Sequence, residues 1–250
     1  IKWLQVPFTP VALIGTAVAF MIGFQNNAAY DRIWEARKIW GGIVNTSRSL
    51  IITVKDSFYM HRVDSQKDET ENLKAIAHRH IAWLTALRYA MRTKKPWEAS
   101  YESIQKKEIF KYNIPEFTAP LEEELKPHLS QEEFDYVMSY DNKPNAIINL
   151  QSKHFRSLTD EKKLWDFSLL NLQQMLQELT ALQGKSERIK NFPYPKQYGS
   201  IGYHFVHIFM WLLPMAIIPA FAKMGQEIAD TNPFIGTYFV WLNIPFTVVV

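Results

Sequence analysis

Apolar residues are distributed unevenly along this chain, in three long stretches that contain no Asp, Glu, Lys or Arg. They are residues 6–24, 199–222 and 233–250. At a helical rise of about 1.5 Å per residue, the first two reach roughly 28 and 36 Å, and the hydrocarbon core of a bilayer is about 30 Å thick. We therefore predict three transmembrane helices, the third cut short because the sequence stops inside an apolar run. The chain also begins without Met, so we expect residues to be missing from both natural termini.

The segment between the first two stretches, residues 25–198, holds nearly all of the charge and has the periodicity of amphipathic helices. In 31–58 and 68–92, apolar residues recur at three- and four-residue steps. Ser130 followed by Glu133 is the pattern of a capping box. Further helices are expected at 98–108, 119–125, 143–157 and 160–183, the last capped by Thr159 and stopped by Gly184.

The fold class that these patterns predict is all-α. No two runs of alternating polar and apolar residues are joined by a hairpin signal, and no repeat of 20 to 50 residues occurs. Neither Pro nor Gly lies between Phe24 and Trp40. We therefore expect the first membrane helix to continue directly into the helical domain.

Charge gives the orientation and excludes some partners. Basic residues gather where 25–198 meets the membrane, whereas the connector 223–232 holds a single Lys. By the positive-inside tendency, the large domain is cytoplasmic in a multi-pass protein of the inner (plasma) membrane. A net charge of +3, without basic runs interleaved with aromatic residues, excludes nucleic acid as an expected partner.

Two stripes of residues follow the first apolar stretch at a four-residue spacing. Gly15, Ala19 and Gly23 are small residues, which let membrane helices approach closely. Beside them lie Thr16, Phe20 and Phe24. If several copies of the helix surround an axis, this second stripe could line a constriction that gates by dewetting. From spacing alone, a stripe that merely faces lipid or a neighbouring helix is the more common case, because apolar stripes are frequent in membrane helices.

Candidate catalytic chemistry is sparse. The close histidine pairs are His78 with His80 and His204 with His207, the second inside an apolar stretch that supplies no carboxylate as a third ligand. Phosphate-binding glycine loops and nucleophile elbows are absent from the sequence. We therefore expect no metal, no cofactor and no enzymatic activity, with a His204/His207 membrane enzyme kept as a minor alternative.

The residues after the first apolar stretch resemble a signature of bacterial members of the bestrophin family. The shared elements are Gly23-Phe24, Asn27, Tyr30, Arg32, Trp34-Glu35-Ala36-Arg37 and Trp40-Gly41, with a second match at Glu187-Arg188-Ile189 followed by Pro193 and Pro195. Within the first motif, Glu35 stands three residues from both Arg32 and Lys38, a spacing that predicts ion pairs along the helix. Gln25 stands where the family often has a basic residue.

This resemblance implies a homopentamer around a central pore, embedded in membrane lipids and conducting small monovalent ions. Its membrane neck would be lined by Thr16, Phe20 and Phe24. A cytoplasmic aperture would be formed by Phe167, with Leu164 and Leu170 as alternatives. Whether anions or cations are preferred is left open. The competing class is a membrane-anchored helical scaffold or signalling protein.

Overall fold

The computed structural model describes residues 6–58, 66–95, 114–193 and 195–239. These residues form helices and contain no strand, apart from one isolated bridge between Phe58 and Leu164. The all-α prediction is confirmed. The elements are α1 (Phe8–Ser57), α2 (Gln66–Arg92), α4 (Pro115–Thr118), α5 (Leu121–Leu125), the 3-10 helix η3 (Lys126–His128), α6 (Gln131–Met138), α7 (Lys143–Asp160), α8 (Asp166–Asn191), α9 (Lys196–Ala229) and α10 (Pro233–Phe239).

The chain divides into two units, which are described separately. The first contains residues 1–34 and 193–250, and the second contains residues 35–192. Helix α1 is a single helix of 50 residues that belongs to both. The continuity expected from the absence of Pro and Gly after Phe24 is therefore observed.

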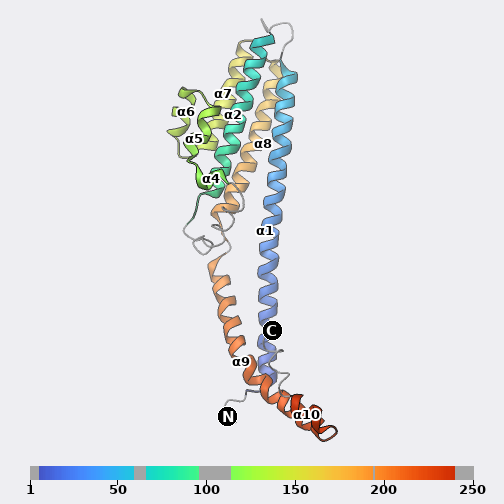
Figure 1. Ribbon diagram of the computed structural model, residues 1–250. Coiled ribbons are helices and arrows are strands. Elements are labelled where there is room, and N and C mark those ends of the chain that lie inside the picture. Colours follow the sequence, from blue (N-terminus) through green and yellow to red (C-terminus); the bar gives the residue numbers. More distant parts are fainter. Residues whose placement is uncertain (1–5, 59–65, 96–113, 194, 240–250) are drawn as a thin grey trace. The chain divides into compact units, whose positions relative to one another are not determined.

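In the second unit, α2, α7 and α8 run side by side with the later part of α1 (Figure 1). Their apolar faces form one core, in which Ile43, Leu50, Trp83 and Leu179 are almost completely buried. The indole Nε1 of Trp83 donates a hydrogen bond of 3.0 Å to Gln183 Oε1. A buried polar group is thus satisfied across two helices, as such groups generally must be.

Two local predictions at α6 and α7 are confirmed. The Glu133 amide donates to Ser130 Oγ over 3.3 Å, and the Ser130 amide donates to Glu133 Oε2 over 3.2 Å, which completes the capping box that opens α6. Helix α7 begins at Lys143 with Pro144 in its first turn, as predicted, and ends at Asp160. The helix predicted at 98–108 lies outside the described residues.

The prediction for residues 160–183 is wrong at both ends. Thr159 does not cap a helix, because its hydroxyl donates to Phe155 O within α7. The chain then turns through Lys162, whose φ of 59° is left-handed, before α8 begins at Asp166. Gly184 lies inside α8, which continues to Asn191 and ends just before Pro193, because the residue before a proline is biased away from the helical conformation.

The first unit contains the apolar helices. Helix α9 is uncharged from Gly199 to Ala222 and includes Pro214 and Pro219. Two described segments, Phe8–Ser57 and Gly199–Ala229, are long and apolar enough to cross a membrane. Of the third predicted span, 233–250, the structure describes the beginning, α10, which packs on α9; residues 240–250 lie outside the described residues.

Candidate functional site

One face of α1 in the first unit packs against α9. Val11 is buried there in a cluster with Leu213 and Ile217. A Cβ added to Gly15 would come within 2.7 Å of Phe209 Cε2, so the absence of a side chain permits this approach. The side chain of Gln25 occupies the space beside Gly202, again on α9.

The opposite face of α1 carries exposed bulky residues. Phe20 is 64% exposed, Phe24 is 70% exposed and Leu13 is 67% exposed. At about 100° of rotation per helical residue, Leu13 lies about 20° from Phe20, and Thr16 and Phe24 each lie about 40° from it. The packed residues Val11, Gly15, Val18 and Gln25 lie between about 140° and 180° from Phe20 on the same count. The neck candidates therefore stand on the face that α9 leaves open.

The Thr16 hydroxyl makes this face less polar than a free hydroxyl would, because its hydrogen is already used within α1. It donates a hydrogen bond of 3.0 Å to the carbonyl oxygen of Ala12, one turn earlier in α1. This is the usual way for a helical Thr to satisfy its own donor. Leu13, which the spacing argument did not select, extends the apolar part of the stripe toward the start of the helix.

The predicted stripe of small residues contacts its neighbour at only one described position. Gly15 meets the Phe209 ring, whereas nothing lies within 4 Å of a Cβ added to Gly23. Ala19 is exposed. Close approach to α9 therefore depends on Gly15, and the remainder of the stripe is open in a single copy of the chain.

The three candidates for the cytoplasmic aperture differ sharply in exposure. Phe167 is 72% exposed and Leu170 is 67% exposed, both near the start of α8. Leu164 is completely buried and bridges to Phe58, so its side chain belongs to the core and does not reach a surface. The ring of Trp165 lies edge-on to that of Phe167, with centroids 5.7 Å apart. Phe167 and Leu170 thus have the exposure that a pore-lining residue needs.

The family-motif residues on α1 have mainly structural contacts. The rings of Tyr30 and Trp34 stack with centroids 6.3 Å apart. Glu35 accepts from Arg188 Nη2 over 2.8 Å, a partner 153 residues away that the expected pairing with Arg32 or Lys38 did not include. This ion pair therefore joins the first motif to the second match, Glu187-Arg188-Ile189, within the second unit. The remaining motif residues are Asn27, which is exposed, Arg32, Arg37 and the partly buried Trp40.

A buried polar cluster links α2, α6 and α7. Arg79 donates from Nη2 to Glu133 Oε1 over 2.6 Å, from Nη1 to Gln151 Oε1 over 3.1 Å and from Nη1 to His154 Nδ1 over 2.8 Å. His154 Nε2 in turn donates to Asn72 Oδ1 over 3.3 Å. Burial, with the adjacent Arg79 charge, lowers the pKa of His154 to about 4. His154 is therefore neutral at physiological pH, as its acceptor role toward Arg79 requires.

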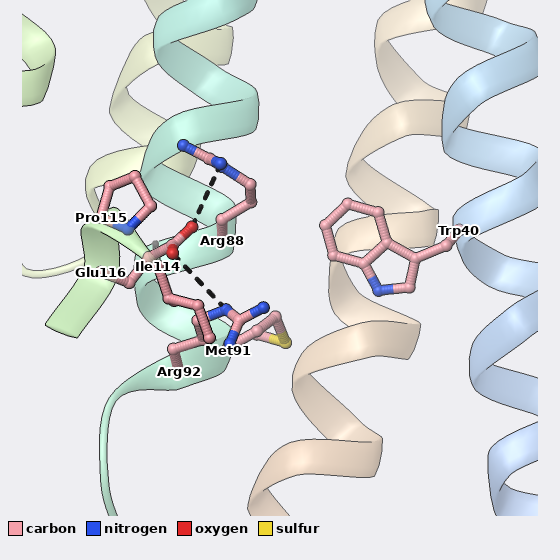
Figure 2. A pocket seen from close by; sticks show the side chains of 7 residues that line it. All are labelled: Trp40, Arg88, Met91, Arg92, Ile114, Pro115 and Glu116. Atoms are coloured by element: carbon pink, nitrogen blue, oxygen red, sulfur yellow. Dashed lines mark ion pairs between the residues drawn. The ribbon is translucent and has the colours of Figure 1, made fainter. Parts of the chain in front are cut away.

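A pocket of about 550 Å³ lies beside α2 and α4 in the second unit. Figure 2 shows Glu116 between two arginines, with Trp40 facing them from α1. Arg88 Nη1 lies 3.2 Å from Glu116 Oε1, and Arg92 Nε lies 3.6 Å from Glu116 Oε2. The Glu116 carboxylate is almost fully buried, so both guanidinium groups compensate it and fasten α4 onto α2.

His78 and His80, which are close in the sequence, have separate contacts in the structure. His78 faces His128, with their Nδ1 atoms 3.1 Å apart, and His80 is buried beside Trp83. In α9, His207 Nδ1 donates to the Tyr203 carbonyl oxygen over 2.8 Å. Within the described residues, no group of three or more His, Cys, Asp and Glu is placed to hold a metal ion.

The described residues define an all-helical class of protein, with two helices long and apolar enough to cross a membrane and an exposed apolar face on the first of them. The family model described as "Bacterial/Fungal Bestrophin protein" matches residues 1–227. The chain belongs to this bestrophin family, which the motif residues predicted.

Relatives and solved structures agree with this assignment. The voltage-dependent anion channel-forming protein YneE of Escherichia coli K12 is 26% identical over 217 residues, covering 86% of this chain and 60% of the relative. The voltage-dependent anion channel-forming protein RSc3414 of Ralstonia nicotianae is 27% identical over 226 residues, covering 87% and 62%. A bacterial bestrophin homologue from Klebsiella pneumoniae shares the fold, with a TM-score of 0.69, 22% identity and coverage of 94% of this chain and 73% of that chain. The chain thus spans about 60% of the length of these sequence relatives.

Proposed function

We propose that this chain is a subunit of a homopentameric ion channel of the inner (plasma) membrane, which passes small monovalent ions down their gradient. The observation that carries the proposal is the exposed stripe of Thr16, Phe20 and Phe24, opposite the face that packs on α9. Among the described residues, a single copy leaves these three side chains exposed. Copies arranged around an axis would give each ring an identical neighbour.

The names of the relatives support the same function. The similar proteins from Escherichia coli and Ralstonia nicotianae are described as anion channel-forming. A passive pore needs no catalytic group, and the described residues offer no assembled metal site. In this proposal the chain works as a passive channel, with membrane lipids and permeant ions as its other partners.

Conduction in this proposal is controlled at two constrictions. In the membrane, rings of Phe20 and Phe24 form an apolar neck that is dry when narrow and conducts when wetted. In the cytoplasmic domain, Phe167 forms the aperture, with Leu170 one helical turn further along α8. Bulky apolar side chains at both places limit the passage of hydrated ions without binding them tightly.

Ion flux in liposomes tests the proposal. Phe20→Ala and Phe24→Ala remove rings from the narrowest apolar segment, so each should raise flux at least about twofold above wild type by easing wetting of the neck. Phe205→Ala on α9 is the matched control, because Phe205 is half-exposed in the same unit but lies on another helix. Wild-type flux equal to that of empty liposomes would overturn the channel function, and unchanged flux in both neck variants would overturn the neck assignment.

A further inference from the structure

Asp31 lies on the same face of α1 as the aromatic stripe. At about 100° per residue it stands about 20° from Phe20, and Asn27 stands about 20° from Phe20 on the other side. Both residues are exposed, and both belong to the first unit. Asp31 comes seven positions after Phe24, a rise of about 10 Å along the helix. The stripe therefore passes from apolar rings to an amide and then to a carboxylate.

No other charge precedes Asp31 after the neck residues. The positions from Gln25 to Tyr30 are uncharged, and Gln25 itself is turned toward Gly202 on α9. Within the described part of the chain, no Lys, Arg or His lies within ion-pair distance of the Asp31 carboxylate. Among these residues, no salt bridge cancels its negative charge.

The neighbouring base points to a different face. Arg32 lies about 120° from Phe20 around the helix, and it lines a pocket with Gln25, Ala29 and Gly199 on the side where α1 meets α9. Asp31 and Arg32 are consecutive and opposite in charge, but they lie on different faces of α1. The Asp31 carboxylate is on the face of the stripe, and the Arg32 guanidinium is on the side that packs on α9.

We propose that Asp31 is the specificity-determining residue of this channel and that it makes the pore favour monovalent cations. The inference rests on the proposed function, because only an assembly around an axis brings one Asp31 from each copy together. Rings of Asp or Glu select cations by raising their local concentration and repelling anions. The Asp31 carboxylates of all copies would form a circle roughly 10 Å beyond Phe24, in the path of every ion that leaves the neck.

This selectivity differs from the one in the names of the relatives, which are anion channel-forming. A channel with the anion preference in its relatives' names and a channel governed by Asp31 give reversal potentials of opposite sign. Charge at a pore mouth is screened by salt over about 8 Å at 0.15 M ionic strength. The preference should therefore be strongest in dilute solution.

Reversal potentials in a KCl gradient, with full-length chains in planar bilayers, test the proposal. Wild type should be more permeable to K⁺ than to Cl⁻. Asp31→Asn should lower the K⁺/Cl⁻ permeability ratio at least about threefold while current persists, and Asp31→Lys should invert the preference. Asp31→Glu should keep the wild-type ratio, which separates loss of charge from disturbance of the helix. Asp230→Asn, the same change at the end of α9, should leave the ratio unchanged.

Two results would overturn the inference in different ways. A conducting Asp31→Asn variant with the wild-type ratio would refute the role of Asp31 and leave the channel function standing. Wild type without current would refute both. Size-exclusion chromatography of each variant against wild type confirms that the oligomer is intact before its ratio is compared.

Discussion

His80 is a single residue whose environment conflicts with its chemistry. It lies in the core of the second unit at 7% exposure, with its ring 5.4 Å from that of Trp83. Its Nε2 atom has no hydrogen-bond partner among the described residues. Burial lowers the pKa of His80 from 6.5 to about 4. The folded protein therefore holds this ring neutral over a range in which the unfolded chain would protonate it.

This difference predicts acid sensitivity. Because the folded-state pKa is the lower one, the stability that depends on neutral His80 is present above pH 6.5 and is lost as the pH falls toward 4. A shift of that size corresponds to about 3 kcal/mol once the pH reaches 4. Thermal unfolding in detergent should show a smaller acid-induced fall in Tm for His80→Leu than for wild type. His204→Leu, at an exposed position, is the control and should follow wild type. Equal falls in all three would refute the role of His80.

Sequence reasoning at the residue scale succeeded where partners are close along the chain. The capping box of Ser130 and Glu133 was predicted because its two residues are three positions apart. The pair of Glu35 and Arg188 was not, because no local spacing relates residues 153 positions apart. Glu133 also shows the limit: the sequence indicates its cap but not its second contact with Arg79.

At the scale of elements, the contact of α1 with α9 depends on Gly15. A methyl group at Gly15 would meet the Phe209 ring at 2.7 Å, whereas one at Gly23 would meet nothing within 4 Å. Gly15→Ala should therefore lower stability by about 1 to 3 kcal/mol through overpacking. Gly23→Ala, the matched control, should raise stability by up to about 1 kcal/mol, because Ala is the better helix former.

Melting temperatures in one detergent compare the two changes. Adding Phe209→Leu to Gly15→Ala should recover part of the loss, because a smaller side chain makes room for the new methyl group. Shifts of the same sign in Gly15→Ala and Gly23→Ala would contradict the packing described for these two helices.

Helix periodicity predicted most described elements, and the exceptions have physical causes. The boundary between α7 and α8 was missed because Lys162 adopts a left-handed conformation that Gly or Asn usually marks in a sequence. Gly184 was taken as a stop, yet α8 continues for about two further turns beyond it, to Asn191. Tertiary contacts override local propensity at such positions.

At the scale of the whole molecule, sequence spacing identified the stripe of Thr16, Phe20 and Phe24. It could not determine whether the stripe faces a pore, lipid or a neighbouring helix. Spacing specifies which residues share a face and says nothing of what covers that face. The structure adds that α9 covers the opposite side of α1. The aperture shows the same limit: the sequence placed it at Phe167 with Leu164 and Leu170 as alternatives, and burial in the structure separates Leu164 from the other two.

The central claim is that this stripe faces water along a shared axis. The chain contains no cysteine, so Phe24→Cys and Val18→Cys each introduce a single thiol, the first on the stripe and the second at a buried position about 160° around the helix from Phe20. A charged, membrane-impermeant thiosulfonate reagent applied to the channel in liposomes modifies thiols that water reaches. We predict that it changes flux through the Phe24→Cys channel at least about twofold and leaves the Val18→Cys channel unchanged. A Phe24→Cys channel that neither reacts nor changes its flux would place the stripe against lipid and contradict the account.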